Sequence, residues 1–261
     1  MGLVHAEDLK AALRPDTILV SIMAANNEVG TVEPIKELAA LAHEAGVLFH
    51  TDAVQAAGHI SVDVKDWNVD LLSLSAHKFH GPRGVGAIYI KKATPILPLI
   101  YGGGQEKGRR SGTENVAGAW GLAAALSEAV DSLEAEAARL SALRDKLIDS
   151  LLKVPASRLT GHPTQRLPGL ASFVFECVEG EGILLKMDAA GICISTGSAC
   201  SSTSLEPSHV LLGIGLPHEI AHGSVRLSLG ADTTEEDVDY IIETLPRVLD
   251  ELRAMSPLWN N

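Results

Sequence analysis

Short apolar runs alternate with helical stretches along the first part of the chain. Four runs have the length and composition of strands: 17–23, 47–51, 70–75 and 84–90. Between the first two, the apolar positions of 35–45 recur at helical spacing, and Pro34 and Gly46 stand where a helix begins and ends. Strand, helix and strand joined by short connections predict a mainly parallel α/β sheet.

The pattern changes in the second half. Residues 115–154 form one long helical pattern that stops before Pro155, which predicts a bent helix leaving one domain and entering the next. Beyond it we expect strands at 171–178, 192–195 and 225–229, a helix at 182–190, and a last helix capped by Thr233 and Thr234. The expected domains are therefore a large domain over 1–133 and a smaller α+β domain over 134–261.

Composition narrows the class of protein. The 261 residues are 46% hydrophobic and 21% charged, which is typical of a globular chain with a substantial core. The 33 acidic and 21 basic residues give a net charge of −12, which disfavours nucleic acid as a partner. The longest apolar run is too short to span a membrane, and the N-terminus lacks the pattern of a signal peptide, so we expect a cytoplasmic protein.

The three cysteines are too few for a disulfide framework and indicate a reducing compartment. Cys177 and Cys193 lie in apolar alternating segments, which favours positions in the core. Cys200 instead lies within a run of small residues at 195–204 that is typical of a loop.

The strongest chemical pattern is Asp52 and Gln55 after one predicted strand, followed by Ser75, His77 and Lys78 after the next. Each residue alone is explained by an ordinary structural role, such as a solvated lysine or a capping aspartate. Together they lie where parallel strands end, which is where open α/β sheets bind ligands.

This combination suits pyridoxal 5′-phosphate (PLP). A lysine can hold that cofactor as an exchangeable Schiff base, and a carboxylate such as Asp52 can hold the proton on the pyridine nitrogen. Gln55 could reach the ring oxygen, and Ser75 and His77 could bind the phosphate.

Four motifs resemble one family in combination. They are Asn-Asn-Glu-Val-Gly at 26–30, Ser-Ala-His-Lys at 75–78, Gly-Pro-Arg-Gly-Val-Gly at 81–86 and Thr-Gly-Ser-Ala-Cys-Ser at 196–201. The chain is similar over almost its whole length to the cysteine desulfurases of NifS and IscS type, which are PLP-dependent and class-V aminotransferase-like. The resemblance implies the type I fold of PLP-dependent transferases, with a partial large domain and a smaller C-terminal domain.

The resemblance also implies roles for individual residues. Lys78 would hold the cofactor, and Asp52, Gln55, Ser75 and His77 would bind it as described above. Asn27 would lie beside the ring oxygen and the substrate carboxylate, and Arg226 would bind that carboxylate. Thr113 would reach the cofactor of a partner subunit, which implies a homodimer.

Cys200 would be the nucleophile of the reaction. Free L-cysteine would lose its sulfur to Cys200, leaving L-alanine and a persulfide that is passed to an acceptor such as an iron–sulfur scaffold protein. Lys78 or another base, with His77 near it, would move the protons.

The chain departs from the family pattern at its N-terminus. In relatives of this kind, an N-terminal segment that makes up roughly a third of the protein precedes the position of Gly2, and it includes a phosphate-binding loop and a histidine that stacks on the ring. Either another polypeptide supplies this segment or the chain is a truncated gene product. In both cases we expect an exposed apolar sheet surface that drives association.

Other interpretations stay open. One is a catalytically silent fragment that acts as a binding partner in sulfur transfer, and another is a selenocysteine or cystine lyase of the same family. A third is a metal hydrolase that uses Asp52, His77 and His80, although Gly81 and Pro82 prevent a continuous helix there.

Overall fold

The computed structural model describes residues 1–197 and 206–259. Contacts between Cα atoms divide the chain into two compact units. The first unit contains 4–25 and 33–133, and the second contains 134–261 together with 1–3 and 26–32. Segment 26–32 belongs with the second unit because Arg166 donates to the carbonyl of Val29 and the Leu167 amide donates to the carbonyl of Gly30.

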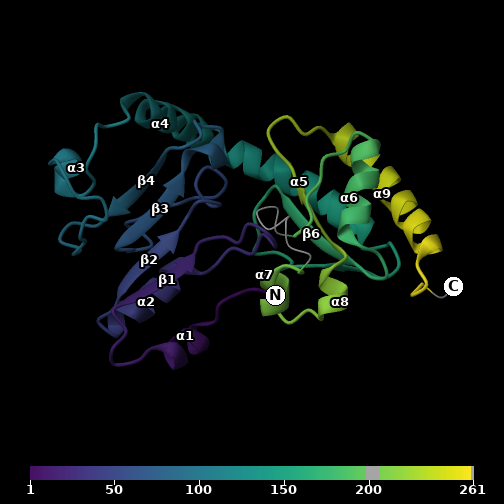
Figure 1. The fold of residues 1–261 in the computed structure, drawn as a ribbon, viewed down its shortest axis with the longest axis horizontal. Coiled ribbons are helices and arrows are strands. Elements are labelled where there is room, and N and C mark those ends of the chain that lie inside the picture. Colours follow the sequence, from purple (N-terminus) through teal and green to yellow (C-terminus); the bar gives the residue numbers. More distant parts are fainter. Residues whose placement is uncertain (198–205, 260–261) are drawn as a thin grey trace. The chain divides into compact units, whose positions relative to one another are not determined.

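The first unit is built on a four-stranded sheet with the order β1-β2-β3-β4 (Figure 1). Its strands are β1 (Leu19–Met23), β2 (Leu48–Asp52), β3 (Leu71–Ser75) and β4 (Gly86–Ile90). The pairs β1–β2 and β2–β3 are parallel, and β4 is antiparallel to β3. The predicted α/β sheet is therefore confirmed, with an antiparallel strand at one edge.

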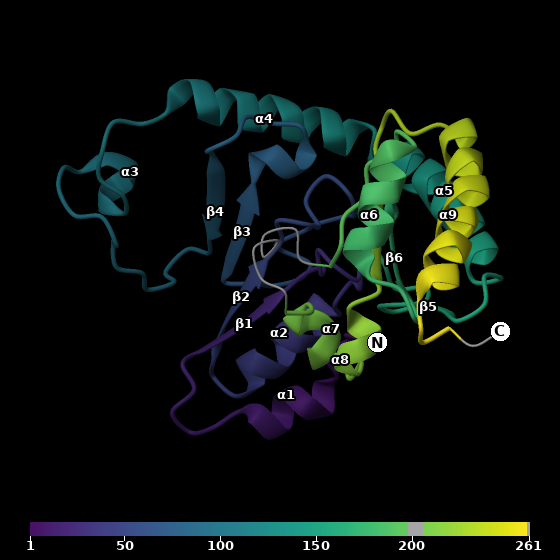
Figure 2. The same ribbon diagram turned by 45° about the vertical axis from the view of Figure 1, so that its right-hand side comes forward.

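Helices cover this sheet unevenly. The helices of the first unit are α1 (Ala6–Ala12), α2 (Ile35–Glu44), α3 (Gln105–Gly108) and α4 (Val116–Asp131), and a 3₁₀ turn, η1, spans Ala76–Phe79. Helix α2 buries Leu38, Ala39 and Ala42 and contacts β2, and α4 contacts η1 (Figure 2). Along β1 the side chains of Leu19, Ser21 and Met23 are exposed while Val20 between them is buried, so one face of the sheet is open.

The second unit packs helices on a three-stranded antiparallel sheet of order β5-β6-β7. Its strands are β5 (Ser157–Leu159), β6 (Leu170–Phe175) and β7 (Ser224–Ser228), and its helices are α5 (Leu133–Leu151), α6 (Gly180–Ala189), α7 (His209–Gly213), α8 (His218–Ala221) and α9 (Glu235–Met255). Every residue of β6 is buried, because this central strand has side chains packed on both faces. The predicted cap of the last helix is confirmed: Thr234 and Asp237 bind each other's backbone amides.

The structure refines one sequence expectation and corrects another. The long helical pattern is interrupted at Ser132, which ends α4 with its amide bonded to the carbonyl of Glu128. Residues 192–195 form no ladder of their own and make a single bridge, between Ser195 and Arg226. Among the described residues, no helix is long and apolar enough to cross a membrane.

Candidate active site

Asp52 is the last residue of β2, at the carboxyl end of the parallel strands of the first unit. Its side chain is exposed, and Oδ1 accepts a hydrogen bond from the Val54 amide at 2.9 Å. In the parallel pairing its partner on β3 is Ser73, two residues before the end of that strand. The ends of β2 and β3 therefore lie side by side, and Gln55 belongs to the turn that follows β2.

Lys78 lies in the 3₁₀ turn that directly follows β3. The turn exists because Ala76 and Phe79 are buried against apolar side chains of α4, which leaves His77 exposed and Lys78 half-buried. Ser75 Oγ and His77 Nδ1 are 2.8 Å apart and share a hydrogen bond.

The turn is closed by the Gly81 amide, which donates to the Ala76 carbonyl at 2.8 Å. A Cβ at position 81 would lie 2.9 Å from that carbonyl oxygen, so only glycine allows this approach. His59, which the sequence analysis did not single out, donates through Nε2 to the Lys78 carbonyl at 2.9 Å.

A histidine on the open face of the sheet also escaped the sequence analysis. His50 Nδ1 lies 2.8 Å from Ser21 Oγ, and its Nε2 lies 2.9 Å from Ser73 Oγ. Burial lowers the pKa of His50, and the nearby charge of Asp52 opposes this. A neutral imidazole donates from one ring nitrogen and accepts at the other, so His50 joins β1, β2 and β3 beside Asp52. The sequence did contain a signal for this residue: His50 is two positions before Asp52 in the strand, so both side chains lie on the same face of the sheet.

In the second unit, Asn27 and Arg226 meet. Arg226 on β7 donates through Nη1 to the Asn27 carbonyl at 2.9 Å. Within the described part of the chain, Arg226 Nε is buried without a hydrogen-bond partner. A guanidinium with a buried, unsatisfied N–H is suited to an oxyanion such as a carboxylate.

The structure thus brings the predicted residues into two groups. Asp52 and the Ser75–Lys78 turn end neighbouring strands of the first unit, and Asn27 contacts Arg226 in the second. Thr113 is exposed in the loop before α4, and Cys200 lies outside the described residues.

The metal alternative finds no support. Among the residues that the structure describes, no group of three or more histidine, cysteine, aspartate or glutamate side chains could hold a metal ion. His80 ends the 3₁₀ turn with a φ of 64°, so it does not continue the helical turn that contains His77.

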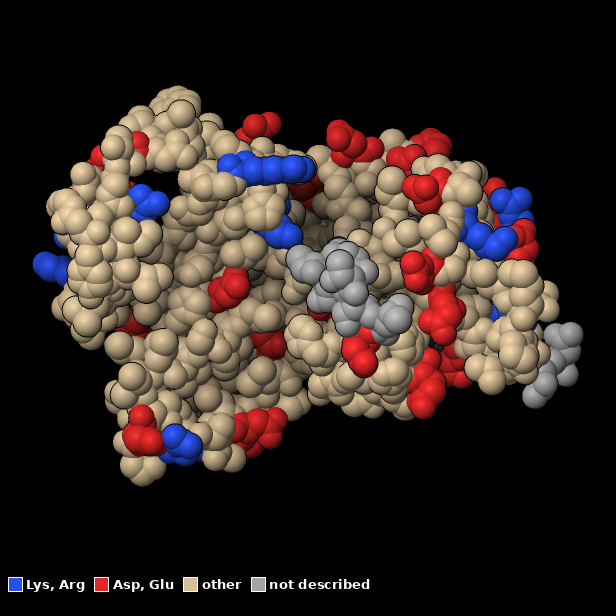
Figure 3. All heavy atoms as spheres, in the orientation of Figure 1, with Lys and Arg blue, Asp and Glu red and all other residues tan. Residues whose placement is uncertain are grey.

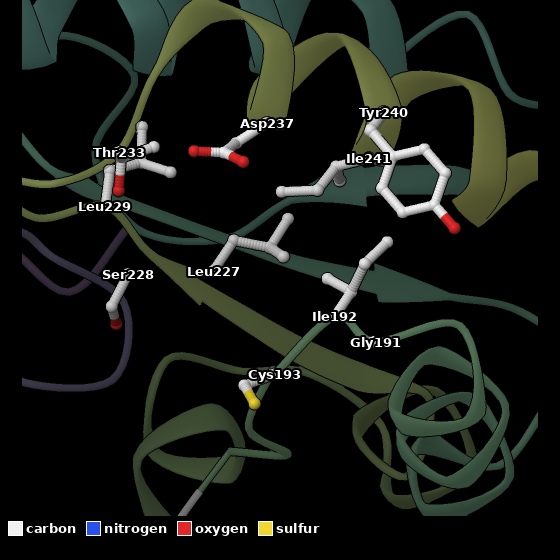
Figure 4. A pocket seen from close by; sticks show the side chains of 10 residues that line it. All are labelled: Gly191, Ile192, Cys193, Leu227, Ser228, Leu229, Thr233, Asp237, Tyr240 and Ile241. Atoms are coloured by element: carbon white, nitrogen blue, oxygen red, sulfur yellow. The ribbon is translucent and has the colours of Figure 1, made fainter.

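Cys193 is exposed, so the expectation that it lies in the core is wrong. It borders a shallow pocket in the second unit whose lining includes Leu227, Tyr240 and Ile241. Figure 4 shows its thiol pointing away from the apolar side chains there. Cys177 follows β6 with a φ of 63° and is only half-buried, since its backbone turns out of the core.

Comparison with known proteins gives consistent results. The profile of the family described as aminotransferase class-V matches residues 1–241. A cysteine desulfurase IscS of Clostridium botulinum is 56% identical over 263 residues, covering 100% of this chain and 66% of the relative. The cysteine desulfurase NifS of Azotobacter vinelandii is 47% identical and covers 99% of this chain and 65% of the relative. The chain therefore spans just under two thirds of the length of these relatives.

Solved structures agree with the sequence relatives. A NifS-like protein has a TM-score of 0.88 and 40% identity over 96% of this chain and 66% of its own. A NifS-like protein from Rickettsia africae has a TM-score of 0.87 and 32% identity over 95% of this chain and 67% of its own. The resemblance to NifS and IscS proteins and the expected fold are thereby confirmed, and the chain belongs to the class-V aminotransferase family.

Proposed function

We propose that this chain acts as a PLP-dependent cysteine desulfurase that converts L-cysteine to L-alanine and leaves the sulfur on Cys200. One observation carries the proposal: Asp52 and the turn that contains Lys78 end two adjacent parallel strands. Relatives named cysteine desulfurase support the choice of reaction, and a solved relative is described as SspA in complex with cysteine.

The side chains at these strand ends fit PLP in their chemistry. The amine of Lys78, a half-buried residue, would bind the carbonyl carbon of the cofactor, and the carboxylate of Asp52 would hold the proton on the pyridine nitrogen. Gln55 would donate to the ring oxygen. The hydroxyl of Ser75 and the imidazole of His77, already joined by a hydrogen bond, would bind phosphate oxygens.

When bound, PLP supplies an electron sink that stabilises negative charge at the substrate α-carbon. The chain's own residues would bind the substrate and move the protons. Arg226, helped by Asn27, would bind the substrate carboxylate and so orient the α-carbon. Lys78 would take the α-proton, and His77 would assist proton movement near it.

Cys200 would attack the sulfur of the substrate as a thiolate. The carbon–sulfur bond breaks, a sulfur–sulfur bond forms, and a proton is delivered to the β-carbon, so cysteine and a thiol become alanine and a persulfide. A sulfur-acceptor protein, such as an iron–sulfur scaffold, would then take the outer sulfur. A reducing compartment such as the cytoplasm would keep Cys200 available as a thiol.

A second copy of the chain fits the apolar surface of the first unit. Large apolar side chains are exposed in the segment before α3 and at the start of α4: Leu97, Leu99, Tyr101, Val116 and Trp120. Uncharged side chains also dominate the surface of this unit in the view of Figure 3. Thr113 lies between these segments, which supports a homodimer in which Thr113 reaches the partner's cofactor.

A companion polypeptide fits the open face of the four-stranded sheet. On this face Leu19, Met23 and Ile88 are 43%, 40% and 49% exposed. Parallel sheets are usually covered on both faces. A companion polypeptide with an apolar surface of its own would cover this face.

Borohydride reduction tests the cofactor assignment. The protein, with any companion that purifies with it, is reduced, digested and examined by mass spectrometry. We expect the cofactor to be fixed on the peptide that contains Lys78, and Lys78→Ala to lose both this mass and all turnover of cysteine. A silent binding partner would carry no cofactor on any peptide, and turnover retained by Lys78→Ala would contradict the proposal.

A further inference from the structure

Glu28, the residue after Asn27, carries a buried carboxylate. It is 3% exposed, and it accepts a hydrogen bond from the hydroxyl of Ser208, which is also buried. Its backbone is fixed in a tight turn, because Asn26 Oδ1 accepts the amides of Glu28 at 2.8 Å and Val29 at 3.0 Å. Glutamate is almost never fully buried unless it is paired, so this arrangement indicates a specific use.

The two residues that flank 198–207 meet at this carboxylate. The Gly197 amide donates to Ser224 Oγ at 3.2 Å. A Cβ on Gly197 would lie 3.0 Å from Ser208 Cβ and 3.4 Å from Glu28 Oε2. Both ends of the segment that contains Cys200 are therefore within contact of one another and of Glu28.

Ser208 also begins a helix. Its Oγ accepts the amides of Val210 at 3.1 Å and Leu211 at 3.4 Å, so it is the N-cap of α7. The hydroxyl donates its one proton to Glu28 while accepting from the helix. The carboxylate thus fixes the start of α7 as well as the end of the Cys200 segment.

The same turn carries Asn27, whose carbonyl is bound by Arg226. We infer that Glu28 is a positioning residue: its carboxylate holds the two ends of the segment that contains Cys200 at the turn that carries Asn27. Glu28 would act through Ser208 and Gly197. The effect of Glu28 on catalysis rests on the proposed function. Its effect on the ends of the segment, Gly197 and Ser208, can be measured independently of that function.

Hydrogen exchange of the 261-residue chain tests the structural part. In Glu28→Gln and Ser208→Ala we expect the amides of Val210 and Leu211 to exchange roughly tenfold faster or more, because Ser208 Oγ, which accepts both amides, either is removed or loses the carboxylate that positions it. The matched control is Glu33→Gln, since Glu33 is also buried and accepts the Val4 amide at 2.8 Å in the first unit.

The double variant sharpens this measurement. If Glu28 and Ser208 act through one hydrogen bond, the amides of the double variant should exchange no faster than those of the faster single variant. Unchanged exchange, or the same change in Glu33→Gln, would overturn the inference. Should Glu28→Gln fail to fold, Ser208→Ala alone decides.

The catalytic part is tested in the protein with its cofactor bound. Glu28→Gln should form the Cys200 persulfide roughly tenfold more slowly, with the cofactor absorbance and the KM for cysteine changed by less than about threefold. A normal rate of persulfide formation in this variant would overturn the inference. If the unsubstituted protein forms no persulfide, the proposed function fails, whereas hydrogen exchange still decides on Glu28.

Discussion

Asp52 and Lys78 are both held by backbone contacts. The Val54 amide fixes one oxygen of Asp52, and His59 binds the carbonyl of Lys78 rather than its amine. Among the described residues, neither the amine of Lys78 nor Oδ2 of Asp52 takes part in the hydrogen bonds that build these turns. Lys78→Ala and Asp52→Asn keep these hydrogen bonds and should leave the local fold intact, so their effects report on chemistry.

Cys200 can be tested against a matched thiol. Cys200→Ala should abolish sulfide release from cysteine and leave the colour of the bound cofactor unchanged, because the nucleophile is lost and the cofactor ligands are not. Cys193→Ala is the control, since Cys193 is an exposed free cysteine of the same unit. Sulfide assays and absorbance spectra check this, and undiminished release from Cys200→Ala would refute the role of the nucleophile.

At the scale of elements, Asp70 joins the parts of the first sheet. It precedes β3, and its Oδ2 accepts from His43 of α2 at 2.7 Å and from the Phe49 amide of β2 at 2.8 Å. Lys91, just after β4, lies 3.7 Å from the other oxygen. Burial alone would raise the pKa of Asp70, but the hydrogen bonds from His43 and Phe49 outweigh it, and the pKa is lower than its usual 3.8.

A lowered pKa makes Asp70 a source of stability that depends on pH. The contribution is fully present above 3.8 and is lost as the pH falls through the lower value of the folded protein. Asp70→Asn should cost about 1–3 kcal/mol of unfolding free energy at pH 7, and the gap to the unsubstituted protein should narrow below pH 3.8. Urea unfolding of both proteins at pH 7 and below pH 3.8 measures this difference in unfolding free energy.

The control for this prediction is Asp66→Asn. Asp66 pairs with Lys36 at the surface, where both side chains are largely exposed, so its loss should cost less than about 0.5 kcal/mol. Equal costs for the two substitutions would show that Asp70 does not join the elements as described.

For the whole molecule, the exposed apolar surface matters most. The chain carries a net charge of −12, which keeps copies apart, yet large apolar side chains are exposed on the open face of the first sheet and before α3. Association with another chain would remove this surface from water, and the free energy would come mainly from apolar burial.

Ile88→Lys tests the sheet face. Ile88 lies opposite Ser73 on the exposed side of β4, so a lysine there should weaken association with a companion polypeptide at least tenfold without lowering stability by more than about 0.5 kcal/mol. Sedimentation at several concentrations measures the association. The control is Leu185→Lys, an exposed apolar position on α6; an equal effect there would mean that the sheet face is not the contact.

Periodicity in the sequence predicted the first unit well, because each of its strands is a short apolar run between turns. Periodicity wrongly predicted a strand at 192–195 and a core position for Cys193. This apolar stretch pairs with β7 only through Ser195, and the side chain of Cys193 is exposed. Periodicity also could not find His50 or Glu28 as partners, since Ser21, Ser73 and Ser208 are distant in sequence and a lone histidine or glutamate carries no pattern.

The sequence by itself determined the family and the α/β order of the first unit, and it supplied the residues proposed to bind PLP, because residue types at fixed local spacing encode strands, turns and motifs. Only the tertiary structure decided that β4 runs antiparallel, that segment 26–32 joins the second unit, and that Glu28 lies between Gly197 and Ser208. These features depend on hydrogen bonds and packing between residues far apart in the chain, which local spacing does not record.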